Sequence, residues 1–586
     1  MPFTFSYQDF GETRRRIYPV EKFLDEEATL VVFVISIFFV IYPVSISIRL
    51  PYIGKKRIPI NLTTAPILAI AILWAAQCLG PSEIRDGIVG TDGVKPYNIL
   101  ILFFSLAYMA ITLDITGVLQ AAAFWVSNKG GSHGYKLFFY FYLMLTALSV
   151  LLGNDPVILS GTAFLVYYTK VTELNPMSWL MSEFVAANTA SMVLFVGNPT
   201  NVVICEGFSV NNAAFTAYTI LPFLACSVAG LIALGFQFRK SKYIPRRLAN
   251  TEELDVRSVL LDPIGAWVGS FLLGFCLIVI IIVSFFHVDV WKISLPFAVT
   301  KFFYDIAWDH YRWAKNIPML GQRLKRKSSA DIPFSPTDIP LETRSGGASM
   351  DKKRNEGDTP QDVSAIPPAG KVAFDESALP TAATNTRVNT RHCENFSQIN
   401  PLSNAFSVHC YLRQTRIAFP HLLYCPARLP FALVPFAFSQ FILIEGLAHQ
   451  GWIEIFANWL VRASHKQMHP VIWLIGVLGV VLCNISGTNI GATILLTKIV
   501  RAAVLPPRSN RAAAISLAVA SNIGAVSFTF SASLAGLLWK QILQQKGIFI
   551  KQRTFAYWNT LPLIVMTVAG LAIVSAEMAV LYPNRP

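Results

Sequence analysis

Four short stretches of this sequence place amide and hydroxyl side chains, together with Gly or Pro, in strongly apolar surroundings. They read "GNDP" (153–156), "AANTASMVLFVGNPTN" (186–201), "SGTNIG" (486–491) and "ASNIGAVSFTFSAS" (520–533). In hydrocarbon an unsatisfied backbone polar group costs several kcal/mol, so such breaks are tolerated only inside protein or along a water-filled cavity. The four stretches therefore predict a polar pocket within a membrane protein.

The chemistry that this pocket offers is the binding of a solute. A broken helix presents free N–H groups and the positive end of its dipole, and Asn, Ser and Thr add donors and acceptors without net charge. We expect the pocket to hold an anion or a neutral polyhydroxy solute. The expected binding residues are Asn154, Asn188, Thr189, Ser191, Asn198, Thr200, Asn201, Ser486, Thr488, Asn489, Ser521, Asn522 and Ser531.

A purely structural interpretation of the same residues stays open. Their side chains could hydrogen-bond one helix to another, and the small residues could allow close packing, as the GxxxG pattern at 487–491 also permits.

Asp155 is the best-placed coupling carboxylate, because charges inside spans are costly and usually functional. It lies in the first break and corresponds to a neutral residue, Asn489, in the second half. A single carboxylate could load and release one proton or cation; the alternative is that Asp155 caps a half-helix. Asp114, Glu206, Glu445 and Lys540 are further charged candidates, which could instead extend to the ends of their spans.

Composition places the chain in a membrane. Hydrophobic residues make up 54% of the 586 residues and charged residues 14%, whereas soluble domains carry about 25% charged residues. The net charge of +14 comes from Lys and Arg in loops between spans, as the positive-inside rule predicts. We therefore expect the lipid bilayer, and no nucleic acid, as a partner.

Apolar runs long enough to cross a hydrocarbon core recur along the chain. The predicted spans are 28–49, 62–80, 98–122, 136–152, 180–204, 213–237, 264–287, 427–448, 470–485, 512–535 and 557–579. The shorter, more polar runs 153–170 and 486–503 are interpreted as re-entrant hairpins or broken helices, and 291–307 as a candidate short span. The first run is too long for a signal peptide and should remain as an anchor.

The predicted organisation has seven parts. They are an N-terminal tail (1–27), peripheral transmembrane helices (28–96), a first transport repeat (97–237), a connecting loop with helices (238–309), a disordered basic cytoplasmic linker (310–426), a second transport repeat (427–580) and a C-terminal tail (581–586). The linker is rich in Ser, Pro, Lys and Asp and cannot bury enough apolar surface to fold alone. It is a candidate binding segment for a cytoplasmic partner, although its part 403–426 is more apolar.

One offset of 334 residues aligns the polar breaks of the two halves. It places Gly117 on Gly451, Gly153 on Gly487 and Asn188 on Asn522. Basic loops after Arg49 and at 239–247 indicate that the two halves cross the membrane in opposite directions, which is typical of transporters. The predicted fold is an all-α polytopic membrane protein with two inverted-topology repeats, containing broken helices or re-entrant hairpins, as in elevator-like transporters.

Motifs of catalysis and metal binding do not account for the polar stretches. The sequence contains no GxxxxGK[ST] and no HExxH, and its eight Cys form no CxxC pair. We expect no enzyme activity, no cofactor and no bound metal.

Several stretches resemble the arsenite permease (ArsB-type) and citrate transporter-like family of the ion-transporter superfamily. They are "GNDPVILSGTAFLVY" (153–167), "FVAANTASMVLFVGNPTNVVICEGF" (184–208), "SASLAGLLWKQILQQKGIFI" (531–550) and "LPLIVMTVAGLAIV" (561–574). The resemblance implies a two-repeat elevator-like transporter with Asn154 and Asp155 in its first hairpin and 188–201 in the first substrate-lining helix. It also implies that 486–489 and 521–533 are their partners in the second repeat.

The leading hypothesis is a secondary active transporter that couples proton flow to efflux of arsenite, antimonite or a related inorganic oxyanion. The alternative is a carrier of citrate, a dicarboxylate or another organic anion coupled to Na⁺ or H⁺. A di- or trianion would favour a cationic residue in the pocket, and the four breaks contain none. A non-transporting scaffold or receptor is the rival from another class, but it predicts no symmetry of polar breaks. We expect a multi-pass protein of the plasma or vacuolar membrane and, by analogy, a homodimer.

Overall fold

The computed structural model describes residues 27–583 apart from 51–53, 92, 249–253, 284, 285, 287, 316, 318–424, 426 and 427. Residues 1–26 of the predicted N-terminal tail, most of the linker 310–426 and the last residues of the C-terminal tail lie outside the described residues.

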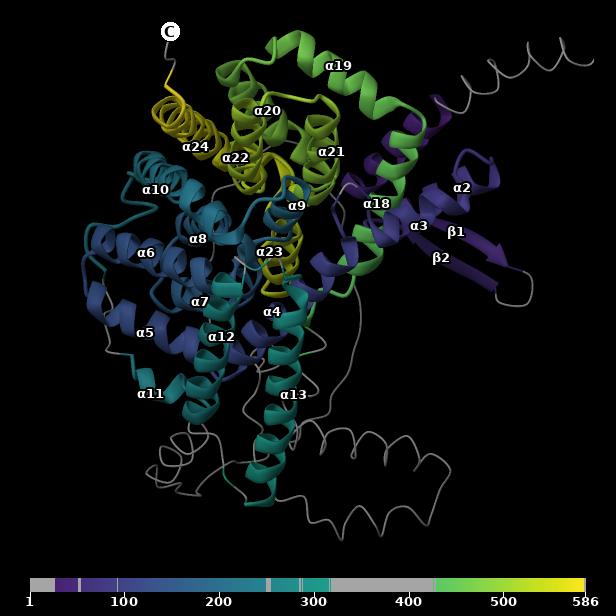
Figure 1. Ribbon diagram of the computed structural model, residues 1–586. Coiled ribbons are helices and arrows are strands. Elements are labelled where there is room, and N and C mark those ends of the chain that lie inside the picture. The colour runs from purple at the N-terminus through teal and green to yellow at the C-terminus, as the bar shows by residue number, and fades with distance from the viewer. Residues whose placement is uncertain are drawn as a thin grey trace, which may run out of the picture.

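Among the described residues, six helices are long and apolar enough to cross a membrane. They are α4 (Pro96–Ile115), α6 (Gly134–Leu152), α10 (Asn212–Gln237), α12 (Pro263–Val283), α20 (Met468–Ile485) and α24 (Gln552–Leu581). The shorter apolar helices are Glu27–Ile41, α2 (Thr64–Ala75) and α18 (Leu433–His449). The chain is therefore a nearly all-helical, multi-pass membrane protein (Figure 1).

The remaining elements lie between these spans. They are α3 (Pro81–Val89), α5 (Val118–Gly130), α7 (Asn154–Val171), α8 (Pro176–Ala190), η1 (Phe195–Gly197), α9 (Pro199–Gly207), α11 (Val256–Val259), α13 (Trp291–Ala314), α19 (Trp452–Ser464), α21 (Asn489–Ala502), α22 (Pro507–Ile523), η3 (Phe530–Ala532) and α23 (Leu534–Gln545).

A β-hairpin replaces the end of the first predicted span. The first helix ends at Ile41, and β1 (Val44–Leu50) pairs with β2 (Gly54–Ile60) in an antiparallel register that sets Val44 opposite Ile60. The sequence "VSISI" alternates β-branched residues with Ser, a pattern that suits a strand. The prediction of a helical span over 28–49 is therefore wrong beyond residue 41.

The predicted span 98–122 consists of two helices. Gly117 adopts φ +87° between α4 and α5, and Gly451 adopts φ +82° between α18 and α19. Glycine takes this left-handed conformation without the steric cost that other residues bear. The two glycines that the 334-residue offset pairs therefore both form the left-handed turn between two helices. The inverted relation of the two halves stays a prediction.

The two short polar runs form continuous helices, α7 and α21. Each follows a turn at a glycine with positive φ, Gly153 (+83°) before α7 and Gly487 (+82°) before α21. Helices α6 and α7 pack against each other, as do α20 and α21. The candidate short span 291–307 extends into the 24-residue helix α13.

Buried apolar side chains form two large clusters. One is built mainly from the first helix, α2, α4, α9, α18 and α21, and the other mainly from α6, α7, α8, α10, α23 and α24. Helix α22 contributes to both, with Leu517 in the first and Val519 in the second. Helices α8 and α9 lie in different clusters, so the break between them marks a boundary between the two cores.

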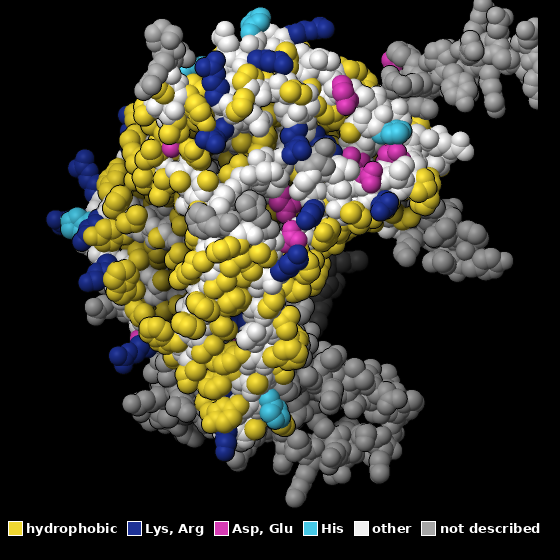
Figure 2. Space-filling model, viewed as in Figure 1, with side chains coloured by type: hydrophobic (Ala, Val, Ile, Leu, Met, Phe, Trp, Pro, Cys, Tyr) yellow, Lys and Arg dark blue, Asp and Glu magenta, His cyan; other side chains and the backbone are white. Residues whose placement is uncertain are grey.

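Exposed apolar side chains gather on the face formed by α12 and α13, which run side by side (Figures 1 and 2). Trp267, Phe271 and Phe303 are among the most exposed, at 79%, 68% and 64%. Figure 2 shows Lys and Arg side chains mainly above this face and at its margin. Such a band is suited to lipid.

Candidate functional site

The second polar stretch interrupts a helix, as predicted. Helix α8 ends at Ala190, η1 covers Phe195–Gly197, and α9 begins at Pro199. Asn198 is extended (φ −151°, ψ 141°), and its Oδ1 accepts a 3.2 Å hydrogen bond from the Thr200 N–H. Pro at the first helical position and Asn at the cap are the residues that favour a helix start. The sequence thus restarts the helix inside the apolar interior.

The fourth stretch repeats this arrangement in the second half. Helix α22 ends at Ile523, η3 covers Phe530–Ala532, and α23 begins at Leu534. Ser533 is extended, and its Oγ accepts a 3.0 Å hydrogen bond from the Gly536 N–H. The two broken helices therefore have the same order of elements: helix, irregular turn, one 3₁₀ turn, capping residue, helix.

Asn522 joins the two broken helices. Its Nδ2 donates to Asn201 Oδ1 at 2.8 Å, and its Oδ1 accepts from Ser191 Oγ at 2.8 Å and from Asn198 Nδ2 at 3.3 Å. The Ser521 hydroxyl donates to Thr200 Oγ1 at 3.3 Å. All six of these residues are buried. We name the set formed by Asn154, Asn188, Ser191, Asn198, Thr200, Asn201, Asn489, Ser521 and Asn522 the amide network.

Asn154 and Asn489 attach the starts of α7 and α21 to the amide network. Asn154 Nδ2 donates to Asn188 Oδ1 at 3.1 Å, and Asn489 Nδ2 donates to the main-chain oxygen of Ser521 at 3.3 Å. Asn188 and Asn522 do not bond to each other directly: Ser191 Oγ lies 2.8 Å from both the Asn188 carbonyl oxygen and Asn522 Oδ1.

The remaining predicted residues lie outside the amide network. The Thr189 hydroxyl points at the sulfur of Met566 on α24, 3.4 Å away. Ser486 and Thr488 bond locally in the α20–α21 turn, where Thr488 Oγ1 accepts from the Gly491 N–H at 3.3 Å. Ser531 is buried in η3, and its hydroxyl has no partner among the described residues.

Asp155 lies in the first turn of α7, directly after Asn154, and is partly buried. Within the described part of the chain its carboxylate has no hydrogen bond or ion pair, so its charge is balanced only by the positive end of the helix dipole. This placement fits a coupling role and a stabilising role at the helix start equally well.

The other charged candidates have defined partners. Asp114 accepts from Ser160 and pairs with Arg428 Nη1 at 3.0 Å. Glu445 pairs with Lys498 Nζ at 2.7 Å. Lys540 Nζ lies 5.1 Å from the centre of the Phe530 ring.

Two buried polar residues close to these elements were missed in the sequence. Glu183, in α8, is fully buried; Thr162 Oγ1 donates to its Oε2 at 2.9 Å, while Oε1 has no partner among the described residues. Gln440, in α18, is fully buried, and both polar atoms of its amide lack a partner in the described chain. A carboxylate or amide inside an apolar helix is itself the signal that could have identified both.

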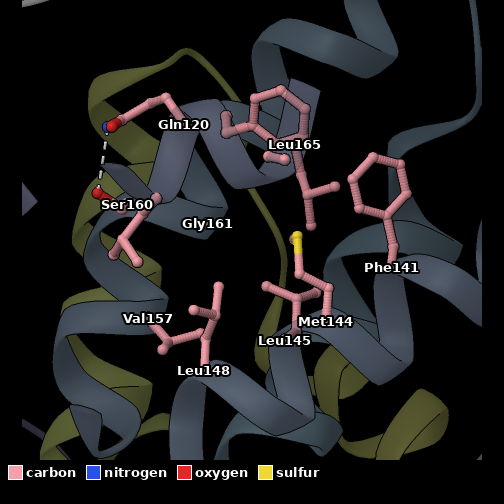
Figure 3. Close-up of a pocket in the computed structure, with 12 residues that line it drawn as sticks. Gln120, Phe141, Met144, Leu145, Leu148, Val157, Ser160, Gly161 and Leu165 are labelled. Carbon is pink, nitrogen blue, oxygen red and sulfur yellow. Dashed lines mark hydrogen bonds between the residues drawn. The ribbon is translucent and has the colours of Figure 1, made fainter. Parts of the chain in front are cut away.

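Figure 3 shows a pocket between α5, α6 and α7 that lies beside this region. Gln120 Nε2 donates to Ser160 Oγ at 3.3 Å at its edge, and the other walls are mostly Phe, Leu, Val and Met. Its open volume is about 10 Å³, room for one water-sized group at most. This pocket is not a solute site in the present conformation.

Comparison with known proteins relates these elements to citrate transporters and to arsenical pump membrane proteins. Residues 29–313 match the family described as citrate transporter (CitMHS). An arsenical pump membrane protein of Escherichia coli is 26% identical over 231 residues, which cover 38% of this chain and 52% of that protein. The resemblance to the arsenite permease and citrate transporter-like family is confirmed.

Two further proteins are similar to this chain at lower sequence identity. The arsenical pump membrane protein of Yersinia enterocolitica is 23% identical over 232 residues, which cover 38% of this chain and 52% of that protein. The chain spans about half the length of the curated relatives it matches. The crystal structure of the YdaH transporter of Alcanivorax borkumensis superimposes with a TM-score of 0.44 at 10% identity, covering 97% of this chain and 100% of that one.

Proposed function

We propose that this citrate transporter-like chain is a secondary active transporter whose solute binds at the amide network. The observation that carries the proposal is the set of hydrogen bonds from Asn522 to Ser191, Asn198 and Asn201. They join two broken helices from distant parts of the sequence at the boundary between two apolar cores. In transporters, the starts of broken helices face the solute at such a polar boundary between two packed cores. The same boundary is where one core can move relative to the other.

Arsenite, antimonite or a related inorganic oxyanion is the proposed cargo. The side chains that bond within the amide network are amides and hydroxyls, which suit a neutral or weakly charged solute. The names of the E. coli and Y. enterocolitica relatives support this choice. Proton-driven efflux, with Asp155 as the coupling carboxylate, completes the proposal.

Uptake of citrate or a dicarboxylate with Na⁺ or H⁺ is the second candidate, supported by the family match over residues 29–313. Such a di- or trianion would gain from a cation in the site, and the bonds of the amide network include none among the described residues. This difference favours the oxyanion.

The deciding experiment expresses the chain in a host that lacks arsenite efflux and measures cellular arsenic and citrate. We expect the host that expresses the chain to accumulate less arsenic than the empty-vector host. The Asn522→Leu variant should accumulate as much arsenic as the empty-vector host. Unchanged arsenic with increased citrate uptake would assign the second candidate. Unchanged levels of both solutes, with the protein present in the membrane, would contradict the transport proposal for these cargoes.

A further inference from the structure

A cavity with several polar side chains lies beside α9 and is lined by Val202, Cys205 and Glu206 of this helix and by Phe195 of η1. It has a volume of about 100 Å³ and forms where the start of α4, the end of α9 and the start of α13 meet. Its polar lining residues are Asn98, Glu206, Asn212 and Trp291, and Leu102 and Phe195 form part of its apolar wall.

Two buried polar atoms on the cavity wall have no hydrogen-bond partner among the described residues. Asn98 is 4% exposed, and its Oδ1 accepts no hydrogen bond from the described residues. The indole Nε1 of Trp291 is buried and has no acceptor among them either. Buried polar groups are normally satisfied, so an unpaired acceptor and an unpaired donor on one cavity indicate an occupant with polar atoms.

Glu206 gives the cavity its negative charge. Its Oε2 accepts the Lys95 N–H at 2.8 Å, and its Oε1 accepts from Asn98 Nδ2 at 3.4 Å. Within the described chain no salt bridge includes Glu206: the nearby ammonium groups of Lys95 and Lys292 lie 3.0 and 2.9 Å from Asp289 instead. A carboxylate that is partly withdrawn from water and bonded only to neutral donors is stabilised by a cation.

We propose that this cavity binds one sodium ion through the Glu206 carboxylate and the Asn98 amide oxygen. The volume accommodates an ion together with several waters, since about 10–15 Å³ of such open volume holds one water. Those waters would accept from the Trp291 N–H and complete the coordination. One carboxylate and one amide oxygen suit a monovalent ion, because divalent cations are held by six or more oxygens, usually from several carboxylates.

The site has a direct connection to the amide network through α9. Thr200 and Asn201 lie in the first turn of this helix and Glu206 in its last, about 8 Å further along the axis. An ion at Glu206 would hold the end of the helix whose start contacts Asn522. Any effect on solute binding rests on the proposed transport function, whereas ion binding itself does not.

The test measures ²²Na⁺ binding to the purified full-length protein in detergent, with choline as the inert cation. We expect saturable binding of one ion per chain. Glu206→Gln should weaken binding by roughly 30-fold or more, and Asn98→Ala should weaken it as well. Glu454→Gln, which changes an exposed glutamate on α19, is the matched control and should bind as the unsubstituted chain does.

Asn522→Leu separates this proposal from the transport proposal. It changes no residue of the cavity, so saturable binding of one Na⁺ per chain should persist even if the shared helix α9 alters the affinity; complete loss of Na⁺ binding in the folded variant would overturn the assignment. Unsaturable binding by the unsubstituted chain, or full affinity in Glu206→Gln, would also overturn it. If Glu206→Gln does not fold, Asn98→Ala decides: unchanged affinity in that variant refutes the site.

Discussion

The side-chain amide of Asn522 donates a 2.8 Å hydrogen bond to Oδ1 of Asn201, 321 residues earlier in the chain. Asn522 lies at the end of α22, and Asn201 lies in the first turn of α9. The bond therefore joins the end of one broken helix to the restart of the other. Both residues are fully buried, so neither can exchange its partner for water without a change in packing.

Asn522→Leu should abolish arsenite efflux. It leaves Ser191, Asn198 and Asn201 without their shared partner, at a cost of about 1–3 kcal/mol for each buried group that stays unsatisfied. Cellular arsenic and the unfolding temperature in detergent are the measurements. Asn510→Leu, on the same helix and outside the amide network, should transport normally. Full efflux by Asn522→Leu would rule out the amide network as the solute site. Asn188→Leu tests the amide network independently and should also abolish efflux.

Asp155→Asn should uncouple transport while the protein stays folded. The substitution keeps the shape of the side chain in the first turn of α7 and removes its charge. Efflux from proteoliposomes driven by a proton gradient should be lost, while passive exchange of arsenite across the membrane continues. Asp255→Asn is the control, because an Asn caps α11 as well as an Asp does. Gradient-driven efflux at the normal rate would show that Asp155 only stabilises the helix start.

Gly153→Ala should destabilise the turn between α6 and α7. Gly153 adopts φ +83° and ψ 172°, a region that is almost restricted to glycine, and occupying it with another residue costs about 1–3 kcal/mol. The added Cβ would also lie 3.2 Å from the Gly197 carbonyl oxygen in the α8–α9 break. Thermal unfolding in detergent checks the loss. Gly235→Ala, inside α10 with no neighbour within 4 Å, should raise stability or leave it unchanged.

Lys301→Met should lower the free energy of unfolding by about 3–5 kcal/mol, because it leaves a buried charge without its partner. Lys301 and Asp305 form an ion pair on α13 with side chains only 1% and 2% exposed, and Tyr108 donates to Asp305 at 3.0 Å. The double variant Lys301→Met/Asp305→Leu should recover most of the loss, since an apolar pair can replace a buried ion pair. Equal stability of the single and double variants would contradict this account.

The class of the protein and the positions of its breaks follow from the sequence. An 18-residue apolar helix is determined by composition alone, because lipid solvates its side chains wherever its neighbours lie. The breaks at 191–198 and 524–533 could be predicted because Gly and Pro act locally on the backbone and Asn or Ser caps the helix that follows. The constant spacing paired Gly117 with Gly451, but their left-handed conformation between two helices was seen only in the structure. The strand over 44–50 was missed because an apolar run suits both a short strand and a helix end.

The partners of each polar side chain were decided only by the tertiary structure. The 334-residue offset placed Asn188 on Asn522 as equivalent positions but could not give their partners, because a hydrogen bond requires atoms within about 3 Å and a helix rotation of one residue removes it. Packing instead sets Asn188 against Asn154 and Asn522 against Ser191, Asn198 and Asn201. The same reason explains Glu206: its charge was visible in the sequence, whereas the cavity beside it exists only where α4, α9 and α13 meet.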